Sequence, residues 1–193
     1  MEMRMFRNNT SRALERASQY AMKSDFCAIF RQQTDRLYLL ALLLMAAPQK
    51  AEECLVGSLG DCIEGNPVFK NWARAWSVRA IMKRAIRMAA PLTQERRENT
   101  QPATGSGMEL TPEAAAMIAA VTHLPAFERF VFVMSVLEGY SDRDCAALLN
   151  CPASAVAAAR LQALKRMELR EATQNPEVYE LPFSQELTEV EVA

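Results

Sequence analysis

The sequence predicts an all-α protein of two small helical domains joined by a flexible linker, with a helix-turn-helix in the second domain. Half of the 193 residues are hydrophobic, but only 7% are aromatic and only 6 are glycine. Because Ala, Leu and Met are abundant, this composition favours helix over sheet. Residues 92–114 are rich in Thr, Gln, Glu, Gly and Pro. Such a stretch cannot form a packed core, which predicts the flexible linker.

The first domain is expected at residues 25–91, after a polar and basic N-terminal extension at residues 1–24. Its first helical segment ends at Pro48 and carries apolar residues at three-to-four spacing: Phe26, Phe30, Leu37, Leu40 and Leu44. A second helix is expected from Ala51 to Ile63, closed by the turn Gly65-Asn66-Pro67. The third runs from Val68 to Ala90, and Pro91 stops it.

The second domain is expected at residues 115–171 and the acidic tail at residues 172–193. Leu124-Pro125 opens a helix that Gly139 ends. Its apolar stripe is Phe127, Phe130, Val131, Met134 and Leu137.

A helix-turn-helix follows this helix. Ser141 precedes Asp144 by three residues, a capping-box spacing that opens a short helix ending at Leu149. Asn150-Cys151-Pro152 forms the turn, and the last helix runs from Ala153 to Arg170. The residues expected to face inward on it are Val156, Ala159, Ala163, Leu164 and Met167. The arrangement is typical of DNA-binding proteins, but a helical hairpin without a DNA role has the same pattern.

The formal net charge of −1 conceals an asymmetry along the chain. Residues 1–97 carry 16 Lys and Arg against 9 Asp and Glu, whereas residues 98–193 carry 6 against 14. Basic residues concentrate at 70–97: Lys70, Arg74, Arg79, Lys83, Arg84, Arg87, Arg96 and Arg97. This stripe fits a polyanion, and an ordinary solvated helix face fits it equally well. The acidic tail is expected to be a solvating segment; the alternative is that it covers the basic stripe.

Cysteine and histidine usage argues against metal and hydrolase chemistry. The five cysteines include no CxxC pair, and His123 is the single histidine. We expect buried thiols in a reducing, cytoplasmic compartment, with no metal site, no cofactor and no enzymatic activity. The longest apolar run, Leu37 to Ala47, is too short to span a bilayer, so no membrane role is expected.

The second domain resembles the promoter-binding C-terminal domain of bacterial RNA polymerase sigma factors. The resemblance lies in Leu124-Pro125-Ala126-Phe127-Glu128-Arg129 and in Leu137-Glu138-Gly139-Tyr140-Ser141-Asp142, followed by Ala146-Ala147-Leu148-Leu149. The first domain is similar to the N-terminal domain of the same family through Ala47-Pro48, Ala51-Glu52-Glu53 and Phe69-Lys70-Asn71-Trp72. The chain is closest to the two-domain, extracytoplasmic-function type, in a divergent form.

The resemblance implies two partners, core RNA polymerase and promoter DNA, and allows an anti-sigma protein as a third. The positions implied for core polymerase are Ala51, Glu52, Glu53 and Leu55. Those implied for melting and reading the downstream promoter element are Trp76, Arg79, Lys83 and Arg87, together with Trp72. They share one helix face, where basic groups neutralise phosphates and an aromatic ring stacks on an unpaired base. We expect Trp72 to be a core residue and leave Trp76 open.

Two features depart from the family pattern. Where the family's recognition helix typically has Thr-Val-Lys-Ser-Arg, this chain has Ala155-Val156-Ala157-Ala158-Ala159, which offers no hydrogen bond to a base edge. The remaining polar residues suit phosphate contacts: Arg143, Ser154, Arg160, Gln162, Lys165 and Arg166. Val56-Gly57-Ser58 replaces the family's Gln and bulky apolar residues, and a helical glycine costs about 1 kcal/mol relative to alanine. The chain is therefore expected to be a transcription initiation factor; the alternative is a sigma-like interaction protein without specific promoter recognition.

Overall fold

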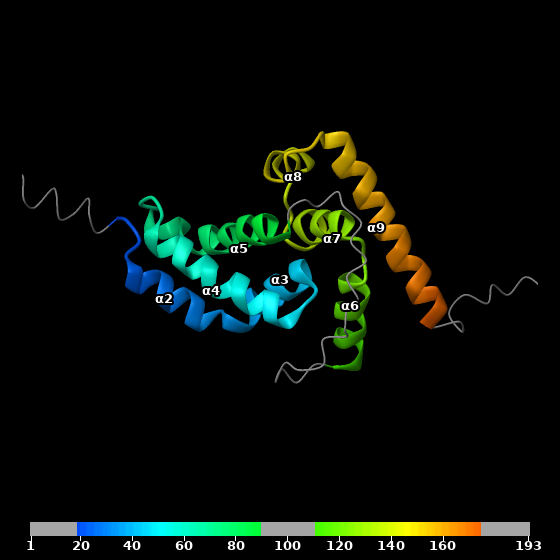
Figure 1. Ribbon diagram of the computed structural model, residues 1–193, viewed down its shortest axis with the longest axis horizontal. Coiled ribbons are helices and arrows are strands. Elements are labelled where there is room, and N and C mark those ends of the chain that lie inside the picture. The colour runs from blue at the N-terminus through cyan, green and yellow to red at the C-terminus, as the bar shows by residue number, and fades with distance from the viewer. Residues whose placement is uncertain (1–18, 90–110, 175–193) are drawn as a thin grey trace, which may run out of the picture.

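A computed structural model describes residues 19–89 and 111–174 of the chain, and these residues form helices joined by short turns (Figure 1). Within them no β-strand occurs, and one antiparallel bridge joins Tyr20 to Phe69. This confirms the all-α class. The expected N-terminal extension, the linker and the acidic tail lie largely outside the described residues.

The first unit contains four α-helices and one 3₁₀ turn within residues 19–89. Their bounds are α2 Lys23–Gln32, α3 Thr34–Met45, α4 Pro48–Glu64, η1 Lys70–Trp72 and α5 Ala73–Ala89. The segment expected to be one helix before Pro48 is thus interrupted at Gln33. There the Thr34 hydroxyl donates to the Phe30 carbonyl at 2.7 Å, a local bond that competes with helix continuation.

Two helix starts in this unit differ from the sequence expectation. α4 begins at Pro48 rather than at Ala51, because proline is accommodated in a first helical turn, where its missing N–H needs no partner. α5 begins at Ala73 rather than at Val68, because residues 70–72 form the separate turn η1. The helices otherwise occupy the expected segments.

α3 supplies the central part of the core. Its residues Leu37, Ala41 and Leu44 are fully buried, as are Ile81 and Met82 of α5. The helix contacts α4 and α5 of its own unit and also α6 and α7 of the second unit. Because α3 is buried on several sides, its sequence is an almost continuous run of apolar residues.

The second unit confirms the helix-turn-helix. It consists of α6 Pro112–Thr122, α7 Ala126–Phe132, the π-helical turn η2 Val133–Leu137, α8 Asp142–Leu149 and α9 Ala153–Gln174. The Ser141 side chain accepts from the Asp144 amide at 3.1 Å and so caps α8 as expected. Asn150 ends α8 in the left-handed conformation with φ of 52°, and α9 follows after the turn.

The second unit departs from expectation in two side chains. Leu137 and Leu164, both expected to face inward, are 49% and 37% exposed. The π-helical turn shifts the end of its helix out of the regular 3.6-residue period, which moves Leu137 off the apolar stripe. Val156, Ala159, Ala163 and Met167 are buried as expected. α9 continues to Gln174, four residues beyond Arg170.

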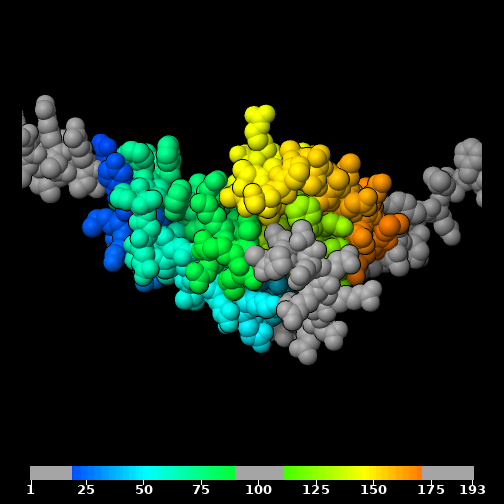
Figure 2. Space-filling view, turned by 45° about the horizontal axis from the view of Figure 1, so that its top comes forward, coloured from blue at the N-terminus to red at the C-terminus, as the bar shows by residue number. Residues whose placement is uncertain are grey.

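The two units pack against each other rather than lying apart. Figure 2 shows the second unit, from yellow-green to orange, seated directly on the first. The Arg129 guanidinium of α7 donates to the Leu44 carbonyl of α3 at 3.1 Å, and Arg36 pairs with Glu138 at 3.4 Å. The first contact joins the last turn of α3 to α7, and the second joins the first turn of α3 to the residue that follows η2.

Candidate nucleic-acid interface

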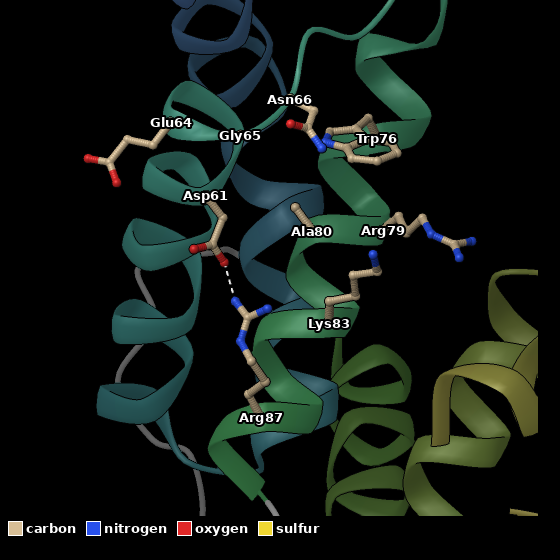
Figure 3. Close-up of a pocket in the computed structure, with 9 residues that line it drawn as sticks. All are labelled: Asp61, Glu64, Gly65, Asn66, Trp76, Arg79, Ala80, Lys83 and Arg87. Atoms are coloured by element: carbon tan, nitrogen blue, oxygen red, sulfur yellow. Dashed lines mark hydrogen bonds and ion pairs between the residues drawn. The ribbon is translucent and has the colours of Figure 1, made fainter. Parts of the chain in front are cut away.

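A groove of about 360 Å³ runs between the end of α4 and the face of α5 (Figure 3). All four residues that were implied for the downstream promoter element line it: Trp76, Arg79, Lys83 and Arg87. Their spacing places them along one side of α5, where Arg87 reaches Asp61 of α4 and Arg79 points away from α4 (Figure 3). The structure therefore brings the four predicted residues together in one surface feature.

Acidic and amide groups from α4 and its following turn complete the groove, and sequence reasoning did not anticipate them. Asp61, Glu64 and Asn66 line the side opposite α5. Asp61 forms ion pairs with Arg87 and with Arg84, the latter at 3.4 Å. Asp61 lies on α4, and α4 meets α5 only through tertiary packing. The helical periodicity of the sequence therefore does not predict that Asp61 contacts α5.

Lys83 and Trp76 form a second pair within the groove. The Lys83 ammonium lies 5.7 Å from the centroid of the Trp76 ring, within the range of a cation–π contact. Trp76 is half-buried against the core, whereas Lys83 is exposed. The open question about Trp76 is thus answered in part: one side of its ring packs inward and part of it faces the groove.

The expectation that Trp72 is a core residue is wrong, since its side chain is 64% exposed. It lies in η1, ahead of α5, and its ring meets Phe69 edge-to-face at 5.6 Å between centroids. Phe69 in turn stacks on Tyr20 at 4.8 Å. We call Tyr20, Phe69 and Trp72 the aromatic patch. Tyr20 could not be placed there from sequence, because the antiparallel bridge to Phe69 joins positions far apart in the chain.

Arg79 reaches the second unit. Its guanidinium points away from Asp61 in Figure 3 and lies beside the Tyr140 side chain. Burial raises the pKa of Tyr140, while the charge and the hydrogen bond of Arg79 act in the opposite direction. A residue implied for DNA contact is thus engaged within the protein.

The residues implied for core polymerase differ in accessibility. Ala51 is fully buried, so it packs in the core of the first unit. Glu52 and Glu53 are exposed in the second turn of α4, and Leu55 is half-buried. The accessible part of this set is therefore an acidic surface near the N-terminal end of α4.

The six residues implied for the upstream element fall into two groups. Arg160 pairs with Asp142 at 2.5 Å, which ties α9 to α8, and Arg166 pairs with Glu128 at 2.8 Å, which ties α9 to α7. The side chains of Arg143, Ser154, Gln162 and Lys165 are exposed. The two arginines thus hold the helix-turn-helix together, while the other four face solvent.

The front of α9 is apolar at the positions that read bases in helix-turn-helix proteins. Val156 and Ala159 are buried, Ala155 and Ala157 are half-buried, and Ala158 is exposed. An alanine methyl can contact a thymine methyl but donates no hydrogen bond. Sequence-independent phosphate contacts are therefore the main chemistry available to this helix.

Among the cysteines of the described residues, Cys54, Cys62 and Cys145 are buried. Burial raises the pKa of Cys54, Cys62 and Cys145 to about 11, which leaves these thiols protonated and unreactive. Within residues 19–89 and 111–174 no group of three or more His, Cys, Asp or Glu could hold a metal ion. Over the same residues, no helix is both long enough and apolar enough to cross a membrane.

A comparison with known protein families finds a match within the second unit. Residues 114–167 match the family model described as sigma-70, region 4. The matched segment includes most of α6, all of α7 and α8, and most of α9. It therefore contains the turn that joins α8 to α9. A search of curated proteins finds no match to the chain.

Proposed function

We propose that this chain, which carries a sigma-70 region 4 domain in residues 114–167, acts in transcription initiation by binding core RNA polymerase and promoter DNA. The observation that carries the proposal is that Trp76, Arg79, Lys83 and Arg87 of α5 line one groove, while Trp72 of the aromatic patch lies in the turn that directly precedes α5. Such a surface combines phosphate neutralisation with stacking, the two interactions that bind unpaired DNA.

The groove and the aromatic patch suit a DNA strand whose bases have separated. Trp72 offers an exposed ring, and Lys70 lies beside it in η1. A base that stacks on the patch leaves its phosphates near the cations of α5. On the α4 side of the groove, Glu64 repels phosphates, whereas Asp61 is already paired with Arg84 and Arg87.

The region 4 domain supports binding to duplex DNA upstream. Its exposed cation Lys165 on α9 and its exposed Arg143 on α8 are suited to phosphates on either side of the major groove. Because alanines occupy the front of α9, we expect the affinity of this domain for duplex DNA to vary little with the DNA sequence. Specificity then depends on the first unit and on the polymerase.

For core polymerase, we propose the exposed acidic surface of α4, formed by Glu52 and Glu53 with Leu55 beside them. We also place the protein in the cytoplasm, where the polymerase acts. The domain boundaries proposed are residues 25–91 and 115–171, with residues 92–114 connecting them.

Retention of the full chain on core RNA polymerase in gel filtration tests the proposal directly. We expect co-elution with the wild-type chain and loss of co-elution with Glu52→Lys/Glu53→Lys. The matched control is Glu113→Lys, a charge reversal at an exposed position in the first turn of α6. If a folded wild-type chain does not co-elute, or if the control loses retention equally, the polymerase part of the proposal is wrong.

A second candidate function is a sigma-like interaction protein that keeps a protein partner but no specific promoter recognition. The observation that favours it is the alanine front of α9. Run-off transcription from a library of genomic fragments separates the two functions. Defined start sites that depend on the added chain support an initiation factor. Polymerase binding without such start sites supports the interaction protein.

A further inference from the structure

Helix α9, at the outer edge of the second unit in Figure 1, exposes leucine side chains near its middle. Leu161 is 58% exposed and Leu164 is 37% exposed. The buried residues Ala159 and Ala163 each lie two positions from Leu161, so helical geometry turns the Leu161 side chain almost directly away from the core. The two leucines thus form an apolar surface on the outward face of α9.

This outward face suits an apolar protein segment better than DNA. Ala157, one turn before Leu161, is half-buried and Ala158 is exposed, so apolar side chains continue along the face. Leucine and alanine offer neither a charge to a phosphate nor a hydrogen bond to a base edge. Covering the leucines with other apolar side chains is favourable instead, because it removes their surface from water.

The surroundings of the two leucines are basic. Residues 153–170 of α9 carry one acidic residue, Glu168, and four cations: Arg160, Lys165, Arg166 and Arg170. Lys165 is exposed and lies one turn after Leu161 on the same face. An occupant that fits this face therefore combines apolar side chains with negative charge.

The chain carries such a segment directly after α9. Residues 175–193 include five glutamates and no Lys or Arg. Tyr179, Leu181 and Phe183 occupy alternate positions in this segment, so an extended backbone presents all three on one side. The segment thus has both the apolar side chains and the charge that the face of α9 requires.

The segment is also long enough to reach the leucines. α9 ends at Gln174, and Pro176 disfavours continuation of the helix because the residue before a proline avoids the helical conformation. Leu161 lies about 20 Å back along the helix from Gln174. Residues 175–193 can span about 60 Å when extended, which allows the chain to turn back and run along α9.

We propose that residues 175–193 fold back and dock on the outward face of α9, where the rings of Tyr179 and Phe183 cover the two leucines. The glutamates then lie near the cations of α9. The basic stripe on α5 is a poorer target, because Arg84 and Arg87 already pair with Asp61.

The docked segment occupies the face that a recognition helix presents to the major groove, so duplex DNA has to displace it. Docking thereby lowers the apparent affinity for duplex DNA by the fraction of molecules in which the face is covered. This regulation rests on the proposed function, whereas the docking itself does not.

NMR of the full chain with labelled leucine methyl groups, without DNA, tests the docking. Tyr179→Leu/Phe183→Leu keeps the segment apolar but removes the aromatic ring currents, so the methyl resonances of Leu161 and Leu164 are expected to move. The methyl groups of Leu137, which is 49% exposed at the end of η2, are the internal control and should not move. Unmoved resonances of both α9 leucines overturn the proposal. Resonances that change with protein concentration also overturn it, because a second copy of the chain then covers the face.

The affinity of the full chain for a short DNA duplex tests the competition. Tyr179→Ala/Phe183→Ala is expected to bind about two- to fivefold more tightly than the wild type, because the docked fraction falls. Ser184→Ala/Gln185→Ala is the matched control in the same segment and should bind as the wild type does. An unchanged affinity of the first variant overturns the competition. If the wild type and both variants fail to bind DNA, the proposed function is wrong, and the methyl resonances still decide the docking.

Discussion

The Arg84 guanidinium lies directly against Gly57 of α4. A Cβ built on Gly57 would be 2.6 Å from Arg84 Nη2, closer than side chains approach in proteins. Arg84 Nη1 also pairs with Asp61 at 3.4 Å, one turn further along α4. The close approach gives a physical reason for a helical glycine at this position.

We predict that Gly57→Ala stabilises the protein less than Gly60→Ala does. Both changes remove a helical glycine, which by itself favours the helix by about 1 kcal/mol. At Gly60 a Cβ meets nothing within 4 Å, so the gain is expected in full. At Gly57 the new methyl displaces Arg84 and offsets the gain by about 1 kcal/mol. Urea unfolding of both variants measures the difference, and equal midpoints would argue against the packing role of Gly57.

A helix end can be predicted well from sequence where a single local contact decides the geometry. The Ser141 and Asp144 spacing correctly predicted the start of α8, because a cap depends on neighbours three residues apart. Trp72 was misplaced because helical spacing cannot reveal that a 3₁₀ turn precedes α5. The partners of Arg160 and Arg87, Asp142 and Asp61, could not be predicted either, since each pair joins different helices.

Trp72→Ala should weaken binding of single-stranded DNA with little effect on stability. The ring is 64% exposed, so its removal leaves no cavity, while stacking on an unpaired base contributes about 1–3 kcal/mol. Fluorescence anisotropy with a labelled oligonucleotide measures the affinity, and thermal unfolding measures the stability. Trp76→Ala is the comparison, because its half-buried ring packs on the core. We expect Trp76→Ala to lower both the DNA affinity and the stability. If Trp72→Ala binds DNA as the wild type does, the aromatic patch is not part of the interface.

The free energy of unfolding should fall between pH 9 and pH 11. The pKa of Cys54, Cys62 and Cys145 rises from 9.0 to about 11 in the folded protein, chiefly because burial disfavours the thiolate. Above pH 9 the unfolded chain loses these protons first, so the stability present below pH 9 is lost as pH rises toward 11. The loss is about 1 kcal/mol per thiol at pH 10.

Cysteine variants isolate this effect from other groups that titrate at high pH. Cys54→Ala removes one buried thiol, and its unfolding free energy should decline less steeply with pH than that of the wild type. Cys27→Ala, at a half-buried position in α2, is the control and should leave the slope closer to the wild-type value. Chemical unfolding at pH 8, 9 and 10 provides the comparison. An unchanged slope in Cys54→Ala would contradict the assignment.

On α9 and α8, neutralising the exposed cations should reduce duplex DNA affinity more than neutralising the paired ones. Lys165→Ala and Arg143→Ala each remove a solvent-facing charge and should lower the salt dependence of binding by about one phosphate contact. Arg160 already neutralises Asp142, and Arg166 already neutralises Glu128. Their replacement by Met should therefore cost stability of the helix-turn-helix and change the salt slope less. Affinities measured across a range of salt concentrations, on two unrelated duplexes, separate the groups. A larger slope change in Arg160→Met than in Lys165→Ala would show that the ion pair opens to receive DNA.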